Sequence, residues 1–527
     1  MNYAALFRAT LPETALEIAA LLVLVIDLGF LRKAAAQTRI AVAAVVGVAG
    51  CAAALWAVSI AGSYNFGNAV LLAAGGPAGV AQVAILILTA LTLLLFVGST
   101  FTRHPGEYVS VVLMAAAGGM IISAAQDLLV IFVGLELLSL GLYILTAFAK
   151  KSGKSAESAM KYYLFGGMSA AFLLFGFSYL YGISGSTYLP TVIYRANDAA
   201  FSGAAPLLLI ALVMIAAGLG FKIAAVPFHF WAPDTYEGAP APAAAFIASV
   251  SKVASFALLI SISRTALAYL QILMQNAHTT GRVYLTTGVT GVPIRPVFTI
   301  YYGWYLILIV LAVASMILGN LAALAQSSVR RLLAYSAIAH AGYILLGLAF
   351  FDWGSRSAQA VLYYIVTYGL TTIGAFGVVG VVERATGSDK LDSFLGLHKR
   401  SPLLAAVTLI LFLSLAGIPP LVGFWAKFNL FAAVLGMYGG NLRAGAGPAA
   451  PLILVALAIA LSAVSLYYYL QVLKRAYVMP GTDETPIRVH PVTLAVLLLV
   501  AGGVVVFGCF PALLQRWIAD FYPPFMM

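Results

Sequence analysis

Four ionisable side chains lie inside long apolar stretches of this sequence: Glu136, Lys222, Lys252 and Lys427. A charge at the centre of a membrane helix costs about 2.5–3.5 kcal/mol, so four of them cost on the order of 10 kcal/mol before any pairing. Burial disfavours the charged form of a lysine or a glutamate, and an opposite charge within about 4–6 Å restores it. A buried lysine with a movable acidic partner can therefore bind and release a proton. These residues indicate proton transfer within a membrane.

The depth of these residues follows from their position in the apolar runs. Glu136 lies nine residues after Asp127 and fourteen before Lys150, which places it near mid-membrane at about 1.5 Å per helical residue. Lys252 lies similarly deep in the run AFIASVSKVASFALLI. The alternative interpretation is a static salt bridge that holds helices together. It is less favoured for the lysines, because three of them face a single acid.

A fifth candidate is His340, in the run RRLLAYSAIAHAGYILLGL. Ser336 and Tyr343 lie on roughly the same helical face, because residues three and four apart are neighbours on a helix. Two interpretations are open: His340 relays protons between two halves of the chain, or it is a hydrogen-bonded packing group.

Three further polar residues follow closely on Lys222. His229, in PFHFW, is either a cap for freed backbone groups or a functional residue. Asp234 and Glu237 are either ordinary loop residues or part of an entrance to the membrane interior.

The composition is that of a membrane protein. The chain has 527 residues, of which 63% are hydrophobic and 9% charged, and its mean hydropathy is +1.03. Soluble domains carry about a quarter charged residues. The net charge of +11 comes from basic residues scattered in short loops, which favours a role in membrane topology over nucleic-acid binding.

Runs of about 20 apolar residues, the length that crosses a bilayer as a helix, predict fourteen transmembrane helices. The predicted spans start near residues 13, 40, 79, 107, 127, 160, 204, 241, 300, 330, 358, 401, 450 and 492.

The loop charges predict which side each end of the chain faces. With the N-terminus outside, the inner side holds 17 of the 28 Lys and Arg residues and the outer side holds 8, the other 3 being the intramembrane lysines. Because cytoplasmic loops carry the excess of Lys and Arg, both termini are expected on the periplasmic side.

Proline residues predict that two of the spans are discontinuous. Pro227 follows Lys222 by five residues, and Pro419 and Pro420 precede Lys427 by eight and seven. Proline removes a backbone donor and clashes with the preceding turn, so helices 7 and 12 should be broken. Broken helices at corresponding positions of two halves indicate inverted repeats of five helices, spans 4–8 and 9–13.

This organisation divides the chain into five parts: an N-terminal three-helix segment (1–106), a first transporter-like repeat (107–272), an outer-side loop or β-hairpin (273–299), a second repeat (300–477) and a C-terminal helix (478–527). The loop is expected to form a hairpin because β-branched residues flank a Gly-containing turn in RVYLTTGVTGVPIRPVF.

The sequence offers no recognisable cofactor site. Cys51 and Cys509 lie in apolar runs without metal-ligand spacing, and the glycine clusters lack the strand and helix context of a phosphate-binding loop. No metal or nucleotide is therefore expected in this chain.

Several motifs resemble the antiporter-like membrane subunits of respiratory complex I. They are DLLVIFVGLELLSLGLYIL, KYYLFGGMSAAFLLFG, GFKIAAVPFHFWAPDTYEGAPAPAAAFIASVSKVASFA, RRLLAYSAIAHAGYILLGL and AGIPPLVGFWAKF. Within that family the PDTYEGAP run, the following SKVASFA and the lysine at position 427 are most similar to the subunit N group of NADH-quinone oxidoreductases. The similarity covers about residues 107–477.

The resemblance implies the fourteen-helix fold with two inverted five-helix repeats, and it implies residue roles. Glu136 would be the switching partner of Lys222, Lys252 the central relay, His340 a bridge between halves, and Lys427 the donor toward the outer side. The sequence departs from symmetry in one respect, since the second half has no mid-span acid equivalent to Glu136. Its lysine must be tuned by another group, for which His340 is a candidate.

The resemblance also implies a setting. The chain would be a proton-translocating, non-redox subunit in a bacterial inner membrane, packed beside sister antiporter-like subunits and not a stand-alone homo-oligomer. Flavin, iron–sulfur clusters and quinone would be bound by partner subunits. The alternatives are a subunit of a cation/proton antiporter or of a related membrane-bound hydrogenase complex, and a purely structural scaffold.

Overall fold

The computed structural model describes residues 3–66, 69–199, 203–280, 300–351, 356–443, 450–481 and 485–521. Nearly all of the described chain is helical. The helices are α1 (Tyr3–Ala9), α2 (Leu11–Val25), the π-helix η1 (Ile26–Phe30), α3 (Ala36–Ile60), α4 (Gly76–Phe96), α5 (Pro105–Ala124), α6 (Leu128–Thr146), α7 (Gly153–Ser184), α8 (Leu189–Ala199), α9 (Ala205–Ile223), α10 (Trp231–Gly238), α11 (Ala241–Thr280), α12 (Ile300–Leu324), α13 (Val329–Ala349), α14 (Arg356–Thr386), the 3₁₀-helix η3 (Leu391–Phe394), α15 (Leu397–Arg400), α16 (Pro402–Ala416), α17 (Val422–Arg443), α18 (Ala450–Tyr477), α19 (Pro491–Cys509) and α20 (Pro511–Phe521).

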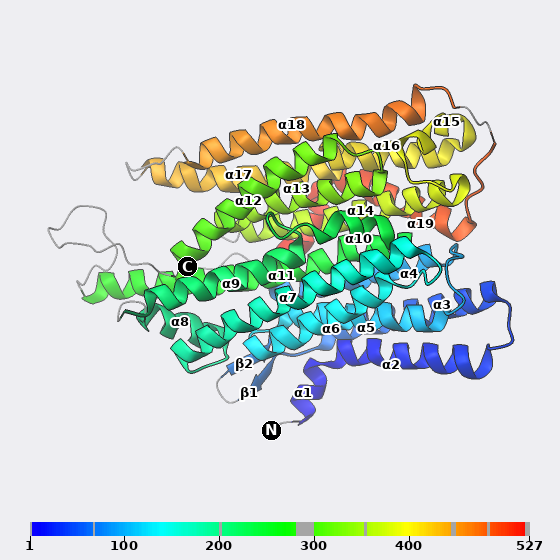
Figure 1. The fold of residues 1–527 in the computed structure, drawn as a ribbon. Coiled ribbons are helices and arrows are strands. Elements are labelled where there is room, and N and C mark those ends of the chain that lie inside the picture. Colours follow the sequence, from blue (N-terminus) through cyan, green and yellow to red (C-terminus); the bar gives the residue numbers. More distant parts are fainter. Residues whose placement is uncertain are drawn as a thin grey trace.

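The long helices lie side by side in one bundle (Figure 1). Within the described residues, twelve helices are long and apolar enough to cross a membrane, and the bent pair formed by α1 with α2 and η1 brings the number to thirteen if it counts as one span. The apolar helices α16 and Val422–Gly436 of α17 are each shorter than a full span. An all-helical chain suits the bilayer because a helix satisfies its own backbone hydrogen bonds.

Side-chain caps fix where several of these helices begin. Asp127 precedes α6 and its carboxylate accepts a hydrogen bond from the backbone N–H of Leu129 at 2.9 Å. Ser152 and Ser328 cap α7 and α13 in the same way. These caps satisfy backbone donors that the first turn of a helix leaves free.

Both predicted helix breaks are present. Helix α9 ends at Ile223, where Ala224 adopts a left-handed conformation with φ of 59°, and α10 begins at Trp231. Helix α16 ends at Ala416, where Gly417 has φ of 88°, and α17 begins at Val422. Lys222 therefore lies in the last turn before one break, and Lys427 in the second turn after the other.

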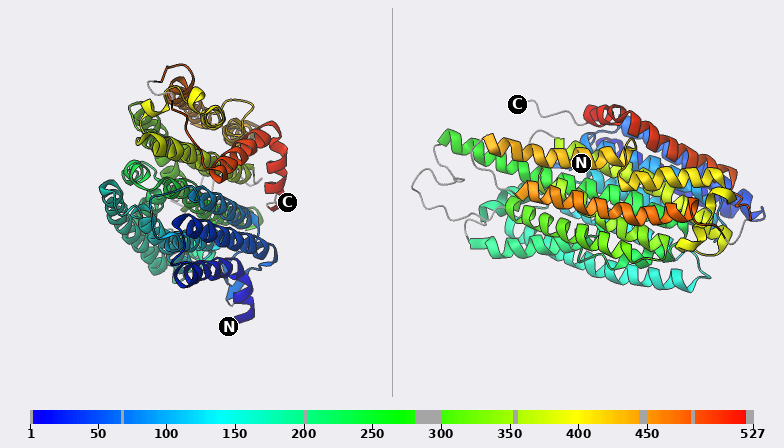
Figure 2. Two further views of the ribbon diagram at one scale, coloured as in Figure 1. Left: turned by 90° about the vertical axis from the view of Figure 1, so that its right-hand side faces the viewer. Right: turned by 90° about the horizontal axis from the view of Figure 1, so that it is seen from above.

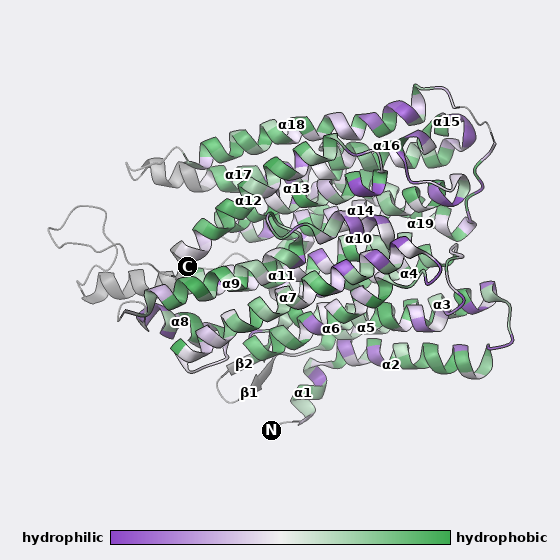
Figure 3. Cartoon of the chain, viewed as in Figure 1, coloured by the Kyte–Doolittle hydropathy of each residue, from purple (hydrophilic) through white to green (hydrophobic). Residues whose placement is uncertain are grey.

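Helices α11, α13 and α14 form the centre of the bundle, because their apolar windows are almost wholly buried. In α7, α18 and α19 less than two fifths of the apolar window is buried, and these helices lie at the periphery in the end view of Figure 2. The hydropathy colouring of Figure 3 shows mainly hydrophobic residues along α18, and hydrophilic residues within the bundle and at one end. The polar groups of the interior are thus surrounded by apolar helices.

The strands form a single small sheet within the described residues. Strands β1 (Tyr64–Phe66) and β2 (Ala69–Leu72) pair antiparallel, with Tyr64 opposite Leu72. The sequence interpretation did not predict this hairpin. The hairpin predicted for residues 273–299 falls mostly on residues 281–299, which lie outside the described residues, and α11 continues to Thr280.

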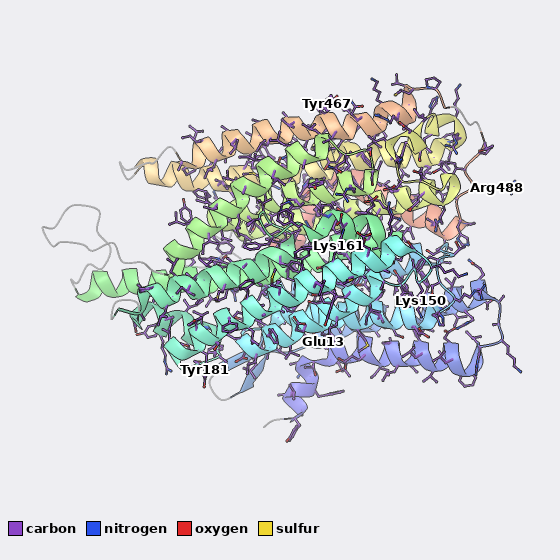
Figure 4. All side chains as sticks on the ribbon, viewed as in Figure 1. Glu13, Lys150, Lys161, Tyr181, Tyr467 and Arg488 are labelled. Carbon is purple, nitrogen blue, oxygen red and sulfur yellow. The ribbon has the colours of Figure 1, made fainter. Side chains whose placement is uncertain are left out.

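Several basic loops gather at one end of the bundle. The loop between α2 and α3 lies at the right of Figure 1, as does α15. Lys150 and Arg488 lie toward the same end in Figure 4. Helix α1, where the described chain begins, lies away from it in Figure 1.

Candidate functional site

Lys222 and Glu136 come close without forming a direct ion pair. Lys222 is buried at the end of α9, and its ammonium donates a hydrogen bond to the Ser139 hydroxyl of α6. Glu136 lies one turn earlier on the same helix and within electrostatic reach of Lys222. The rings of Tyr143 and Phe221 lie 5.8 and 5.6 Å from the lysine nitrogen, as in cation–π contacts.

Glu136 also marks the outer surface of α6. It is partly exposed, and the residues one and two turns away on the same face are exposed as well. These residues are Leu129, Val133, Leu140 and Ile144. We call this face the α6 stripe.

Lys252 lies in the middle of α11 and is 3% exposed. Its nitrogen donates a hydrogen bond to the backbone carbonyl oxygen of Ala337 on α13 at 2.6 Å. The ring of Tyr368 on α14 lies 5.8 Å from the same nitrogen. The lysine of the first half is thus held by residues of the second half.

His340 is surrounded by tyrosine residues. Its Nδ1 lies 2.8 Å from the Tyr364 hydroxyl, and its Nε2 lies 3.3 Å from the Tyr469 hydroxyl. The Tyr469 hydroxyl also bonds to Ser336. The His340 ring contacts the ring of Tyr343 with a centroid separation of 5.9 Å. Both predicted neighbours, Ser336 and Tyr343, therefore belong to the cluster around His340.

His340 also lies between two of the lysines. It is within electrostatic reach of both Lys252 and Lys427. The Tyr368 ring contacts both His340 and Lys252, and the Tyr343 ring contacts both His340 and Lys427. The structure thus brings His340 together with two of the three predicted lysines.

Lys427 forms hydrogen bonds to the end of a helix, whereas an acidic side chain would be the usual partner of a buried lysine. Its nitrogen donates hydrogen bonds to the backbone oxygens of Leu415 and Ala416 at 3.2 and 3.0 Å, and to the Ser462 hydroxyl at 2.8 Å. Leu415 and Ala416 are the last residues of α16. Carbonyl groups at a helix C-terminus lack intrahelical partners and carry the negative end of the helix dipole. They supply the negative potential for which the sequence shows no carboxylate.

A small cavity lies between His340 and the break that carries Lys427. Its volume is about 10 Å³, the room that one water molecule occupies. Residues of four helices line it, among them His340, Tyr364, Thr371, Ser414 and Gly423. Hydroxyl and imidazole groups on its wall can bond to a water there. The cavity can therefore extend a hydrogen-bonded connection from His340 toward the end of α16.

Asp234 and Glu237 belong to an ionic cluster on α10. Asp234 accepts from Arg331 at 2.6 Å and from Lys161 at 2.8 Å, and Glu237 accepts from Lys154 at 2.6 Å and from Arg331 at 3.1 Å. Arg331 lies on α13 and the two lysines lie on α7. The cluster ties the short helix after the first break to helices of both halves.

The neighbouring Arg330 completes this connection. It donates to the backbone oxygen of Ala239 at 2.6 Å and pairs with Glu383 of α14. Beside it lies a cavity of about 410 Å³ with both signs of charge on its wall. Its charged lining residues are Lys154, Glu237, Arg330, Glu383, Arg384 and Asp389. His229 lies two residues before α10 and is buried. Its Nδ1 has no hydrogen-bond partner among the described residues, and it does not line this cavity.

Four contact residues were missed in the sequence interpretation: Ser139, Ser462, Tyr364 and Tyr469. Ser139 had a signal, since it follows Glu136 by three residues and so shares its helix face. The others lie on helices that are apolar almost all round, where the sequence does not reveal which face points inward. Among the described residues, no three His, Cys, Asp or Glu side chains are grouped to hold a metal ion.

Comparison with known proteins identifies the family. The family described as NADH:quinone oxidoreductase/Mrp antiporter, transmembrane region, matches residues 125–281 and 281–444. A relative from Acidobacterium capsulatum, named NADH-quinone oxidoreductase subunit N 2, is 45% identical over 529 residues, covering 98% of this chain and 99% of the relative. The chain belongs to the NADH-quinone oxidoreductase subunit N family. The predicted resemblance is confirmed.

Solved structures support this membership of the subunit N family. A chain of respiratory complex I from Thermus thermophilus is 32% identical, with a TM-score of 0.72 and coverage of 96% of this chain and 98% of that chain. A chain of the Mrp complex from Dietzia has a TM-score of 0.76 at 21% identity, covering 97% of this chain and 51% of that chain. At 21% identity, the similarity to the Mrp chain shows a shared fold and nothing more.

Proposed function

We propose that this chain is a proton-translocating, non-redox subunit in the membrane arm of an NADH-quinone oxidoreductase. The observation that carries the proposal is the row of buried basic side chains that joins the two halves. Lys222, Lys252, His340 and Lys427 are all at most 5% exposed, and His340 lies within electrostatic reach of both Lys252 and Lys427. Buried ionisable groups of this kind mark proton pathways in membrane proteins.

The proposed route runs along the membrane midplane. Glu136 changes the proton affinity of Lys222, Lys252 relays the proton, His340 carries it across to the second half, and Lys427 releases it toward the outer side. Moving one charge against 100 mV costs about 2.3 kcal/mol, which forming or breaking one partly buried ion pair can match. The charged cavity beside Arg330 supports access of water from the end of the bundle where basic loops gather.

The proposed topology has fourteen spans with both termini on the periplasmic side. Helices α16 and α17 together count as the twelfth span, and α2 with η1 as the first. Helices α5 to α11 and α12 to α18 would be the two inverted repeats. The two helix breaks support this division, because each lies in the fourth span of its repeat. The basic loops at one end support the orientation.

The proposed setting is a bacterial inner membrane, with other membrane-arm subunits as neighbours. The α6 stripe supports such a neighbour, because an exposed carboxyl among apolar side chains is costly in lipid. Flavin, iron–sulfur clusters and quinone are assigned to partner subunits. The chain itself then contributes proton transfer and no redox centre.

The test is a Glu136→Gln variant of the assembled complex in sealed membrane vesicles. Electron transfer from NADH to quinone and acidification of the vesicle interior are measured in the same sample. We expect quinone reduction to continue while the number of protons moved per NADH falls. Full proton movement in an assembled Glu136→Gln complex would contradict the role given to Glu136. Lys222→Ala is the parallel variant for the lysine.

A second candidate is a subunit of a cation/proton antiporter or of a membrane-bound hydrogenase complex. The similarity in fold to a chain of the Mrp complex is the observation that favours this second candidate. Purification separates the two candidates, because only the first predicts that the chain co-purifies with flavin and iron–sulfur absorbance. Sodium uptake by vesicles without NADH would favour the antiporter.

A further inference from the structure

Two serine hydroxyls bind the lysines at the helix breaks. Lys222 donates to Ser139 of α6, and Lys427 donates to Ser462 of α18 at 2.8 Å. The two serines come from different helices, so each lysine is tied to a neighbour across a helix interface.

At the first break, the serine bonds to the lysine and lies one helical turn from the acid. Ser139 is fully buried and lies one turn after Glu136 on α6. Its hydroxyl donates to the backbone oxygen of Leu135 and accepts from Lys222. A hydroxyl has one rotatable donor and two acceptor sites. It can therefore accept from a charged lysine, and by rotating it can donate to a neutral one.

At the second break, the other acceptors lack this flexibility. The carbonyl oxygens of Leu415 and Ala416 only accept hydrogen bonds, so they favour the charged form of Lys427. Of the three groups bonded to its nitrogen, Ser462 alone can donate to the neutral form. A Cβ atom at Gly417 would lie 3.2 Å from the Lys427 nitrogen, so the end of α16 closes tightly around the lysine.

We infer that Ser139 and Ser462 are positioning residues for proton transfer, whose hydroxyls partner Lys222 and Lys427 in both protonation states. This inference rests on the proposed function. It predicts an order of effects, because Lys222 has a single hydrogen-bond acceptor among the described residues whereas Lys427 has three. Loss of the Ser139 hydroxyl should slow proton transfer more than loss of the Ser462 hydroxyl.

The experiment compares Ser139→Ala, Ser139→Thr, Ser462→Ala and Ser462→Thr in the complete complex in vesicles. Threonine keeps the hydroxyl at both sites, and at position 139 it can make the same bond to the carbonyl oxygen of Leu135. Ser123→Ala is the matched control, because Ser123 is buried and, among the residues that the structure describes, its hydroxyl bonds to the backbone oxygen of Met120 on its own helix and to no other group. The readouts are protons moved per NADH, the rate of quinone reduction, and the amount of complex on a native gel.

We expect Ser139→Ala to reduce protons per NADH to about the level of Lys222→Ala, with threonine restoring it and Ser123→Ala leaving it unchanged. Loss of one hydrogen bond to a charged group corresponds to a rate change of about ten-fold. Ser462→Ala should give a smaller loss, again restored by threonine. Normal proton movement in both alanine variants, or equal losses in the alanine and threonine variants of both sites, would overturn the inference. If Lys222→Ala itself moves protons normally, the proposed function fails instead.

Discussion

The Lys252 ammonium of α11 donates a 2.6 Å hydrogen bond to the backbone oxygen of Ala337 on α13. Ala337 lies one helical turn before His340. A movement of α13 would therefore change the surroundings of the lysine and the position of the histidine together. The centre of the row of charges is thus a contact between the two halves.

Lys252→Met is the first prediction. Methionine has nearly the length of lysine without its charge, so the helix packing should persist while the proton carrier is lost. We expect assembled complex, continued quinone reduction and fewer protons moved per NADH. Lys151→Met is the control, because Lys151 is exposed in a turn outside the row. Equal proton movement in the two variants would argue that Lys252 is structural.

His340→Phe separates a relay from a packing role. Phenylalanine keeps a ring among Tyr343, Tyr364 and Tyr368, but it removes both hydrogen bonds made by the imidazole. We expect the complex to assemble and the protons moved per NADH to fall. Tyr469→Phe removes the longer of the two His340 bonds together with the bond between Tyr469 and Ser336, keeps the Tyr364 bond, and should have the weaker effect. Unchanged proton movement in His340→Phe would favour the packing interpretation.

Arg331→Ala should loosen α10. The variant removes the contacts of Arg331 with Asp234 and Glu237, in a region where each partly exposed ion pair contributes about 1 kcal/mol or less. We expect lower thermal stability of the complex in detergent, measured by retention of the chain on a native gel after heating. Because salt screens partly exposed charges, the difference from wild type should shrink at high ionic strength. A loss as large in Lys151→Ala would contradict the assignment.

Gly342→Ala should disturb the packing of α13 against α12. An added Cβ would lie 2.7 Å from the backbone nitrogen of Met316 and 2.8 Å from the backbone oxygen of Ala312. Backbone atoms cannot rotate away, so the helices must separate, at a cost of about 1–3 kcal/mol. Gly502→Ala on α19 is the control, because no atom lies within 4 Å of its added Cβ. The stability of the complex to heating distinguishes the two variants, and equal stability would show that α13 can shift freely.

The charged residues and helix breaks could be predicted because each contrasts with its own surroundings. A lysine in an apolar run, such as Lys252, is visible without knowledge of its neighbours, and so is a proline such as Pro227 in a membrane segment. Both predicted breaks occur in the structure, at Ala224 and Gly417.

The partners of these charges could not be predicted from the same pattern. Ser462 and Tyr469 meet Lys427 and His340 only because α18 packs beside α13, α16 and α17, and the outward and inward faces of α18 are both apolar. The acceptor of Lys252 is a main-chain oxygen, which has no sequence signature at all. The groups that take the place of an acid at Lys427 are the backbone oxygens at the end of α16, and they have no sequence signature either.

The α6 stripe places a partly exposed carboxyl group among exposed apolar side chains. Until a neighbour covers Val133 and Glu136, which lie one turn apart on this face, the carboxyl group borders lipid hydrocarbon. A charged group in contact with hydrocarbon costs about 2.5–3.5 kcal/mol, and a neighbouring subunit that covers the stripe removes this contact. A copy of the chain without this neighbour would therefore be less stable in the membrane, so the lifetime of the chain would depend on its assembly.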